Sequence, residues 1–96
     1  MKLRFCSEAL RLLEGTDSPD FSESITERFR NRINLIRNAP DERDFYALKS
    51  LHFEKLSGDR SHQRSMRLNQ QWRLILEFED DGHDKTVAIV AIEDYH

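Results

Sequence analysis

The sequence contains little cysteine, glycine or proline. Its 96 residues include one cysteine, three glycines and two prolines. The lone Cys6 cannot form an internal disulfide, and no basic segment followed by an apolar run of signal-peptide length is present. The composition is typical of a soluble protein rather than a membrane protein. We therefore expect a cytoplasmic protein that does not bind membranes.

Motifs for metals, nucleotides and covalent catalysis are also missing. The three glycines are isolated, so no glycine-rich loop enters a helix to hold phosphates. No serine or cysteine nucleophile signature is present, and Cys6 is interpreted as a small packing residue. The side chains that could bind a metal lack the short paired spacings of zinc and iron sites; they are His52, His62, His83, His96 and Cys6. We expect no metal and no cofactor.

Length and composition predict one domain spanning residues 1–96. Hydrophobic residues make up 38% of the chain and charged residues 34%, which describes a globular rather than a disordered protein. The formal net charge is −3, but basic residues dominate between positions 49 and 73, and acidic residues dominate from position 74 onward. A local basic surface can bind phosphates even on an acidic protein. A solvated charged face explains the same charges equally well.

A predicted β-hairpin at residues 66–78 organises the chain. Its apolar residues share one parity, which places them on one buried face; they are Met66, Leu68, Trp72, Leu74, Leu76 and Phe78. Only an odd loop length keeps this parity, so we expect a three-residue loop at residues 69–71. Arg67 then faces Arg73 on the other face. Facing like charges cost up to about 1 kcal/mol, so the pair requires an anion, either a carboxylate of the fold or a phosphate of a ligand.

The N-terminal half predicts a short strand and two helices. Residues 2–5 alternate in polarity, which indicates a short first strand. Ser7 is a suitable N-cap for a short helix, and Gly15 is placed to end it. Ser24 and Glu27 have capping-box spacing for a longer helix that stops at residues 38–40. Its buried face consists of Ile25, Phe29, Ile33 and Ile36, and its other faces carry Arg28, Arg30, Arg32 and Arg37. These arginines either meet an acidic partner or remain hydrated.

The C-terminal half predicts an antiparallel meander. Residues 41–50 connect to it, with one helical turn after Pro40. Residues 51–55 alternate as a strand that directs His52 and Glu54 outward. The run at residues 86–92 is apolar on both parities, which predicts a strand covered on both faces and central in the sheet. Helices followed by a meander predict an α+β domain, with the N-terminal helices packed on one face of a small antiparallel β-sheet.

The polar residues of this half are suited to phosphodiester chemistry. RNA can be cut without a metal if one group deprotonates the 2′-hydroxyl, cations stabilise the charge on the phosphorane, and an acid protonates the leaving 5′-oxygen. Histidine suits proton transfer and arginine suits phosphate. The candidate cations are Arg67, Arg73, Lys55 and Arg60; the candidate proton carriers are His52, His96, Glu54 and Asp94, with Tyr95 able to stack on a base. In the alternative interpretation, the arginines pair only with Glu54, Glu77 or Asp94.

Three separated motifs resemble one bacterial family. They are Leu56-Ser57-Gly58-Asp59-Arg60, then Ser65-Met66-Arg67-Leu68-Asn69 with Gln71-Trp72-Arg73-Leu74, and the terminal Asp94-Tyr95-His96. The pattern is similar to the HigB group of toxins in the RelE/ParE superfamily, also described as plasmid-maintenance killer proteins. The resemblance is strong over residues 50–96, and the N-terminal helices match in length and layout.

The resemblance implies a RelE-like fold and a type II toxin. Such a toxin is an endonuclease (mRNA interferase) that cuts mRNA on translating ribosomes without a metal, by 2′-hydroxyl attack, and so inhibits translation. Its partner is a HigA-type helix-turn-helix antitoxin that neutralises it, and the complex binds operator DNA through the antitoxin.

The resemblance also implies residue roles. Arg73 is expected to hold the scissile phosphate, His96 to carry a proton and Tyr95 to stack on or position a base beside Asp94. The basic positions expected to contact RNA are Lys55, Arg60, Arg64 and Arg67. Some members have a histidine where this chain has Phe53 or Glu54, depending on gap placement. Either His52 or Glu54 can therefore serve in proton transfer.

Two other functions compete with the nuclease. A ParE-like toxin would inhibit DNA gyrase without cutting RNA, although such an inhibitor has no need of the terminal Tyr95-His96 pair. An inactive relative would act only with its antitoxin, as a repressor complex.

Overall fold

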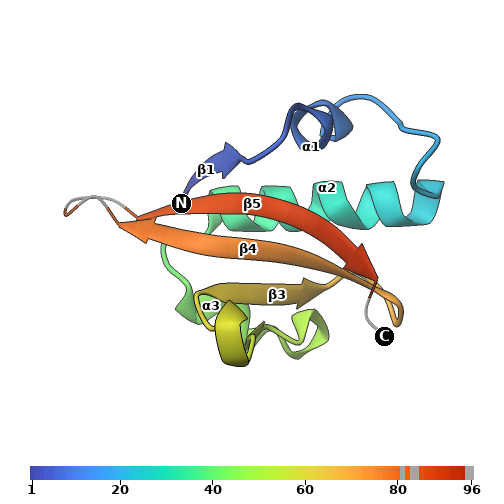
Figure 1. Ribbon diagram of the computed structural model, residues 1–96. Helices are drawn as coiled ribbons and strands as arrows, with labels where there is room; N and C mark the ends of the chain where they lie inside the picture. The colour runs from blue at the N-terminus through green and yellow to red at the C-terminus, as the bar shows by residue number, and fades with distance from the viewer. Residues whose placement is uncertain (81, 83–84, 95–96) are drawn as a thin grey trace.

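The computed structural model describes residues 1–80, 82 and 85–94, which form a five-stranded sheet with helices against one face (Figure 1). The elements are β1 (Lys2–Phe5), α1 (Glu8–Leu13), α2 (Glu23–Asn38), α3 (Arg43–Ala47), the 3₁₀ turn η1 (Lys49–Leu51), β2 (Glu54–Lys55), the 3₁₀ turn η2 (Gly58–Arg60), β3 (Gln63–Arg67), β4 (Trp72–Asp80) and β5 (Lys85–Asp94). The N-terminal strand and both N-terminal helices agree with the sequence. Within the described residues, no helix has the length and apolar character needed to cross a membrane.

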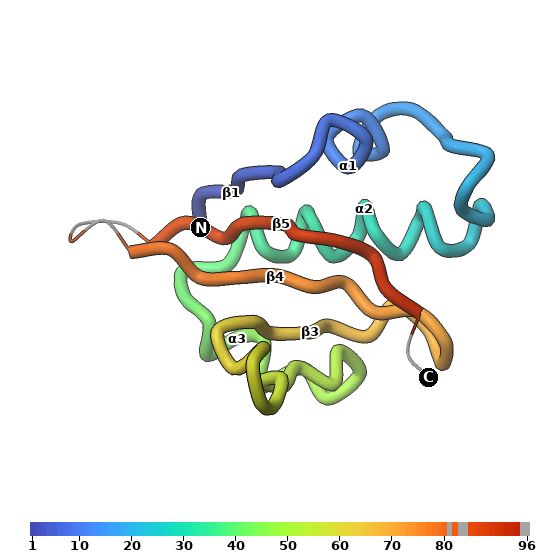
Figure 2. Tube along the Cα trace, in the orientation of Figure 1, coloured from blue at the N-terminus to red at the C-terminus, as the bar shows by residue number. Residues whose placement is uncertain are grey.

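The sheet has the strand order β1-β5-β4-β3-β2. The pairs from β2 to β5 are antiparallel, which confirms the predicted meander and the α+β class. The β1–β5 pair is parallel, so the sheet is mixed rather than purely antiparallel. A parallel pair requires a long crossover, and almost the whole chain separates these two strands. The central strand is β4, with β5 beside it, and the tube trace in Figure 2 follows this arrangement.

The core lies between α2 and one face of the sheet. Phe29, Ile33 and Ile36 are fully buried, as are the β3 and β4 residues of the predicted apolar parity, except that Trp72 and Phe78 are half-buried at the two ends. The β5 strand is less covered than predicted. Its residues Val87, Ala88 and Ile89 are buried, but Val90, Ala91 and Ile92 are only half-buried, beside the register shift in the β4–β5 pairing.

The start of α2 differs from the predicted capping box. Ser22, not Ser24, is the N-cap, and its hydroxyl accepts a hydrogen bond from the backbone N–H of Ile25 at 3.2 Å. Ser24 lies inside the first turn, so the helix begins two residues earlier than the spacing of Ser24 and Glu27 suggested. The predicted stop is confirmed, since Ala39 before Pro40 is extended at ψ 136.

The predicted strand at residues 51–55 is largely wrong. Its first residues form η1, and only Glu54 and Lys55 pair with β3. His52 adopts the left-handed conformation, with φ 44 and ψ 49. This reversal lets Leu51 and Phe53 both enter the core, at 2% and 8% exposure.

The arginines of α2 bind acceptors within the fold, including those that are also exposed to solvent. Arg28 donates to the carbonyl oxygen of Leu68 at 2.9 Å. Arg32 donates twice to the carbonyl oxygen of Arg67, at 3.1 and 3.0 Å, and burial lowers the pKa of Arg32 below its ordinary value. Both contacts satisfy carbonyl groups at the end of β3 and so fix the β3–β4 hairpin on the helix.

Candidate functional site

The β3–β4 hairpin has the predicted register. Arg67 pairs with Arg73, and the backbone N–H of Leu68 bonds to the carbonyl of Trp72 at 2.9 Å. Asn69 stabilises the three-residue loop, because its side-chain oxygen accepts from the N–H groups of Gln71 and Trp72 at 2.8 and 2.7 Å. Alternation along the strands places both arginines on the face opposite α2, which we call the open face.

A carboxylate of the fold lies against the arginine pair. Arg73 is only 4% exposed. Its Nη1 lies 3.0 Å from Glu54 Oε1 and donates to the hydroxyl of Ser65 at 3.1 Å. Glu54 is half-exposed, so one side of its carboxylate meets solvent. The fold therefore supplies an anion for Arg73, which is one of the two alternatives that the facing arginines required.

His52 contacts both arginines of the pair. Its Nε2 lies 3.2 Å from Arg67 Nη1, and its backbone oxygen lies 3.4 Å from Arg73 Nη1. A guanidinium only donates hydrogen bonds, so Nε2 is the acceptor in this contact. The left-handed backbone of His52 costs roughly 1–2 kcal/mol for a non-glycine residue. Such strain is characteristic of functional sites.

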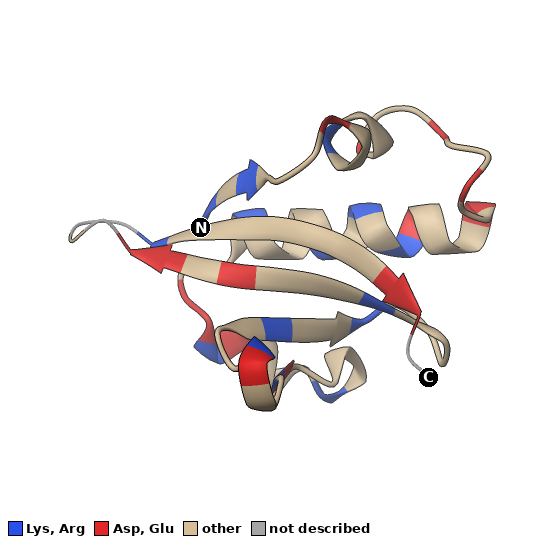
Figure 3. Ribbon diagram, viewed as in Figure 1, with Lys and Arg blue, Asp and Glu red and all other residues tan. Residues whose placement is uncertain are grey.

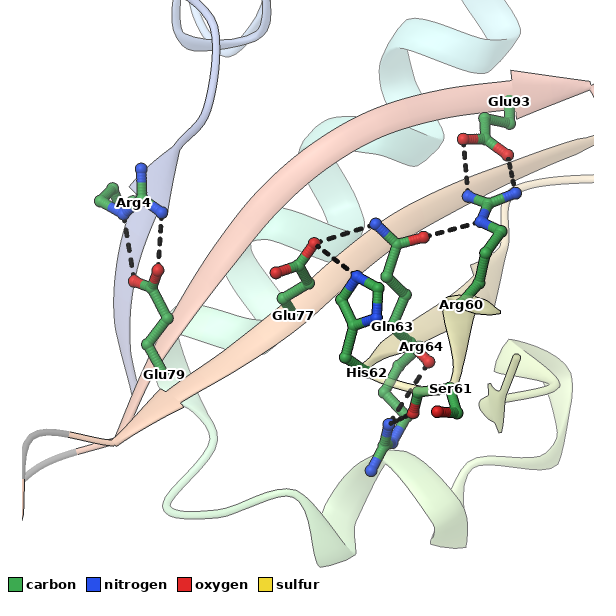
Figure 4. A network of polar contacts seen from close by, with 9 residues as sticks. All are labelled: Arg4, Arg60, Ser61, His62, Gln63, Arg64, Glu77, Glu79 and Glu93. Atoms are coloured by element: carbon green, nitrogen blue, oxygen red, sulfur yellow. Dashed lines mark hydrogen bonds and ion pairs between the residues drawn. The ribbon is translucent and has the colours of Figure 1, made fainter. Parts of the chain in front are cut away.

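A third cation, Arg60, reaches the same end of the open face from η2. Arg60 forms a fork with Glu93 at 2.9 and 2.8 Å (Figure 4). Glu93 pairs in register with Arg73. Arg60 Nε also donates to Gln63, whose amide donates to Glu77 at 2.9 Å. Hydrogen bonding to Glu93 raises the pKa of Arg60 above its ordinary value. In Figure 3 the acidic end of β5 lies beside the basic positions at the ends of β3 and β4.

Lys55 and Arg64 do not join this group. They face each other across β2 and β3, one position out of phase with Glu54 and Ser65, so alternation directs them to the opposite face. The guanidinium of Arg64 lies 5.8 Å from the ring centre of Phe78 and donates to the backbone oxygens of Ser61 and Gln63.

The C-terminal motif begins at the end of β5. Asp94 pairs with Trp72, and its carboxylate accepts from Gln71 of the hairpin loop at 3.1 Å. Asp94 thus lies at the same end of the sheet as Arg73. Tyr95 and His96 lie outside the described residues.

Sequence reasoning missed Ser65 and Glu93. Ser65 shares the parity of Arg67 and Arg73 and is fully buried among polar groups, so the alternation could have placed it beside Arg73. Glu93 becomes a neighbour only through the β4–β5 register, for which the sequence offers no signal. No group of three potential metal ligands comes together among residues 1–80, 82 and 85–94.

Comparisons with known proteins agree with this architecture. The solved structures similar to this chain include a YoeB/ParE toxin from Agrobacterium tumefaciens, with TM-score 0.64, 18% identity and full coverage of both chains. They also include the toxin–antitoxin complex RelBE2 from Mycobacterium tuberculosis, with TM-score 0.51, 20% identity and coverage of 98% of this chain and 96% of that one. At these identities the likeness establishes the fold. No curated protein matches the sequence.

A family model gives the more specific assignment. The model described as the RelE-like toxin of the type II toxin–antitoxin system HigB matches residues 7–96. The match covers strands β2 to β5, the hairpin arginines and the terminal motif, which confirms the resemblance seen in the motifs. The chain therefore belongs to the HigB-like toxin family, the RelE-like toxins of type II toxin–antitoxin systems.

Proposed function

We propose that this toxin is a ribosome-dependent mRNA endonuclease that cleaves RNA without a metal, by 2′-hydroxyl attack. The observation that carries the proposal is the convergence of Arg67, Arg73, His52 and Glu54 on the open face, at the sheet end where β5 leads into the terminal motif. Membership of the RelE-like toxins, which usually act as ribonucleases, supports it.

The proposed roles follow from the chemistry of each group. Arg73 and Arg67 stabilise the negative charge on the phosphorane, because guanidinium donors match phosphate oxygens. His52 offers its Nε2 beside Arg67, and Glu54 offers a half-exposed carboxylate beside Arg73. Either can accept the proton of the 2′-hydroxyl. RNA phosphate competes with Glu54 for Arg73, so binding of the substrate releases the Glu54 carboxylate for this task.

The terminal motif completes the proposed mechanism. His96 protonates the leaving 5′-oxygen, Tyr95 stacks on or positions a base, and Asp94 supports this pair from the end of β5. Histidine is suited to this step because its ordinary pKa is about 6.5. Lys55 and Arg64 remain candidates for contacts with the RNA or ribosomal backbone, which they would make from the opposite face of the sheet.

The proposed partner is a HigA-type helix-turn-helix antitoxin. A type II toxin has a protein antitoxin, and one structural relative was solved as a toxin–antitoxin complex. The complex would repress its own operon, with operator DNA contacted through the antitoxin only. The toxin would act in the cytoplasm as a single domain of residues 1–96.

Expression of the toxin without its antitoxin tests the function. Growth should arrest, and primer extension on a cellular mRNA should reveal cuts inside coding regions. Arg73→Ala and His96→Ala should abolish both effects, whereas Arg4→Ala, at the far end of the open face, should abolish neither. Full toxicity of the double variant would refute the mechanism. DNA damage with intact mRNA would favour a ParE-like gyrase inhibitor, and harmless expression would favour an inactive relative.

A further inference from the structure

The open face carries two arginine–glutamate forks of similar geometry. Arg60 binds Glu93 at 2.9 and 2.8 Å, and Arg4 binds Glu79 at 3.1 and 2.6 Å. Their side chains are comparably exposed, at 45% and 39% for the first fork and 53% and 44% for the second. Figure 4 shows them well separated. The two forks therefore differ mainly in what they join.

The Arg60 fork joins a sharp turn to the end of β5. Gly58 begins the turn at φ 65, and the N–H groups of Arg60 and Ser61 bond back to the carbonyls of Ser57 and Gly58. The turn directs Arg60 over β3 and β4 toward Glu93, the residue before Asp94. This geometry gives a physical reason for the spacing of glycine and arginine in the Leu56-to-Arg60 motif.

The guanidinium of Arg60 is already hydrogen-bonded to acceptors of the protein. All three of its nitrogens hydrogen-bond, Nη1 and Nη2 to Glu93 and Nε to Gln63. A phosphate would have to displace a bidentate carboxylate and break the link to Gln63. Among the described residues, in contrast, no further strand pairs with β5 on the far side of Glu93, because β1 pairs only with residues 86–89 of β5. The fork therefore restrains an edge that the sheet itself leaves open.

We propose that Arg60 is a positioning residue that acts through Glu93, holding the C-terminal end of β5, up to Asp94, beside Arg73, and that it does not bind RNA phosphate. This inference rests on the proposed nuclease function. Loss of the restraint misplaces reacting groups, and a displacement of about 1 Å can reduce a rate by about 100-fold.

Cleavage by Arg60→Ala, Glu93→Ala and the double variant, measured on ribosome-bound mRNA, tests the proposal. We expect each single variant to lower kcat by about 10- to 100-fold with little change in KM. The double variant should be no worse than either, because both changes remove the same restraint. If Arg60 instead bound phosphate, Glu93→Ala would free it and preserve or raise activity. Wild-type activity of Glu93→Ala would thus overturn the proposal.

The Arg4–Glu79 fork supplies the matched control. Arg4→Ala removes an equivalent surface fork, so it should change thermal stability as much as Arg60→Ala does while leaving kcat unchanged. The charge swap Arg60→Glu with Glu93→Arg should restore most of the lost rate. Equal losses of kcat in Arg4→Ala and Arg60→Ala would contradict a positioning role.

Hydrogen exchange separates failure of this inference from failure of the nuclease function. Arg60→Ala should raise amide exchange at residues 92–94 several-fold relative to Arg4→Ala, whether or not the protein cuts RNA. Unchanged exchange there would overturn the proposal even in an active nuclease. Faster exchange in a protein that does not cleave mRNA would support the restraint and refute only the proposed function.

Discussion

Replacing Ser65 with alanine tests whether the buried Arg73 guanidinium depends on its neighbours in the fold. Ser65 is fully buried, and its hydroxyl accepts a hydrogen bond from Arg73 Nη1 at 3.1 Å. Water cannot easily replace the hydroxyl at a site without solvent access. The substitution therefore removes an acceptor from a cation that is itself only 4% exposed.

The expected cost follows from the remaining contacts. A hydrogen bond to a charged group contributes about 1.5–3 kcal/mol. Glu54 stays 3.0 Å from Arg73 Nη1 in the variant and continues to compensate its charge, so we expect the lower end, about 1.5 kcal/mol. For a domain of this size that corresponds to a decrease in Tm of about 6–12 °C.

Urea unfolding followed by fluorescence of Trp72, the one tryptophan, measures this cost. The decisive comparison is a double-mutant cycle with Arg73→Met. In that background, Ser65→Ala should cost less than about 0.5 kcal/mol, because the cation that needs the hydroxyl is gone. Ser50→Ala, at an exposed serine, is the control and should have no effect. Equal losses from Ser65→Ala in both backgrounds would refute the reasoning.

Two further predictions concern acid and the η2 turn. Arg37 lowers the pKa of the Glu14 carboxyl below its ordinary value through a side-chain hydrogen bond. The stabilisation from this pair is therefore complete above the unfolded-state pKa and is lost as the pH falls through the folded-state pKa. Glu14→Gln should flatten the decline in Tm between pH 6 and pH 3, and an unchanged decline would contradict this. Gly58→Ala should lower the free energy of unfolding by about 1 kcal/mol, because φ is 65 there and alanine disfavours the left-handed region. The control is Gly15→Ala, since Gly15 lies outside the left-handed region and has open space around it; urea unfolding should show it to be neutral or stabilising. Equal effects of the two substitutions would argue against strain at η2.

The hairpin shows how much of the local structure the sequence pattern can predict. A strict period-2 pattern and an odd loop length were enough to predict that Arg67 pairs with Arg73, because a slip of one residue would expose the whole apolar face. The segment at residues 51–55 shows the limit. Its alternation was read as a strand, but His52 is left-handed. Packing of Leu51 and Phe53 in the core outweighed the local preference for extended backbone.

By itself the sequence determined the α+β class, the hairpin register, the helix faces and the family, since these depend on periodicity and on motifs close together in the chain. Only the tertiary structure decided which acceptors surround the cations. Arg73 meets Glu54 and Ser65, whereas Arg60 meets Glu93, 33 positions away. The physical reason is that side-chain partners across strands are set by register and by turns such as His52 and Gly58, and those conformations depend on long-range packing that no local pattern encodes.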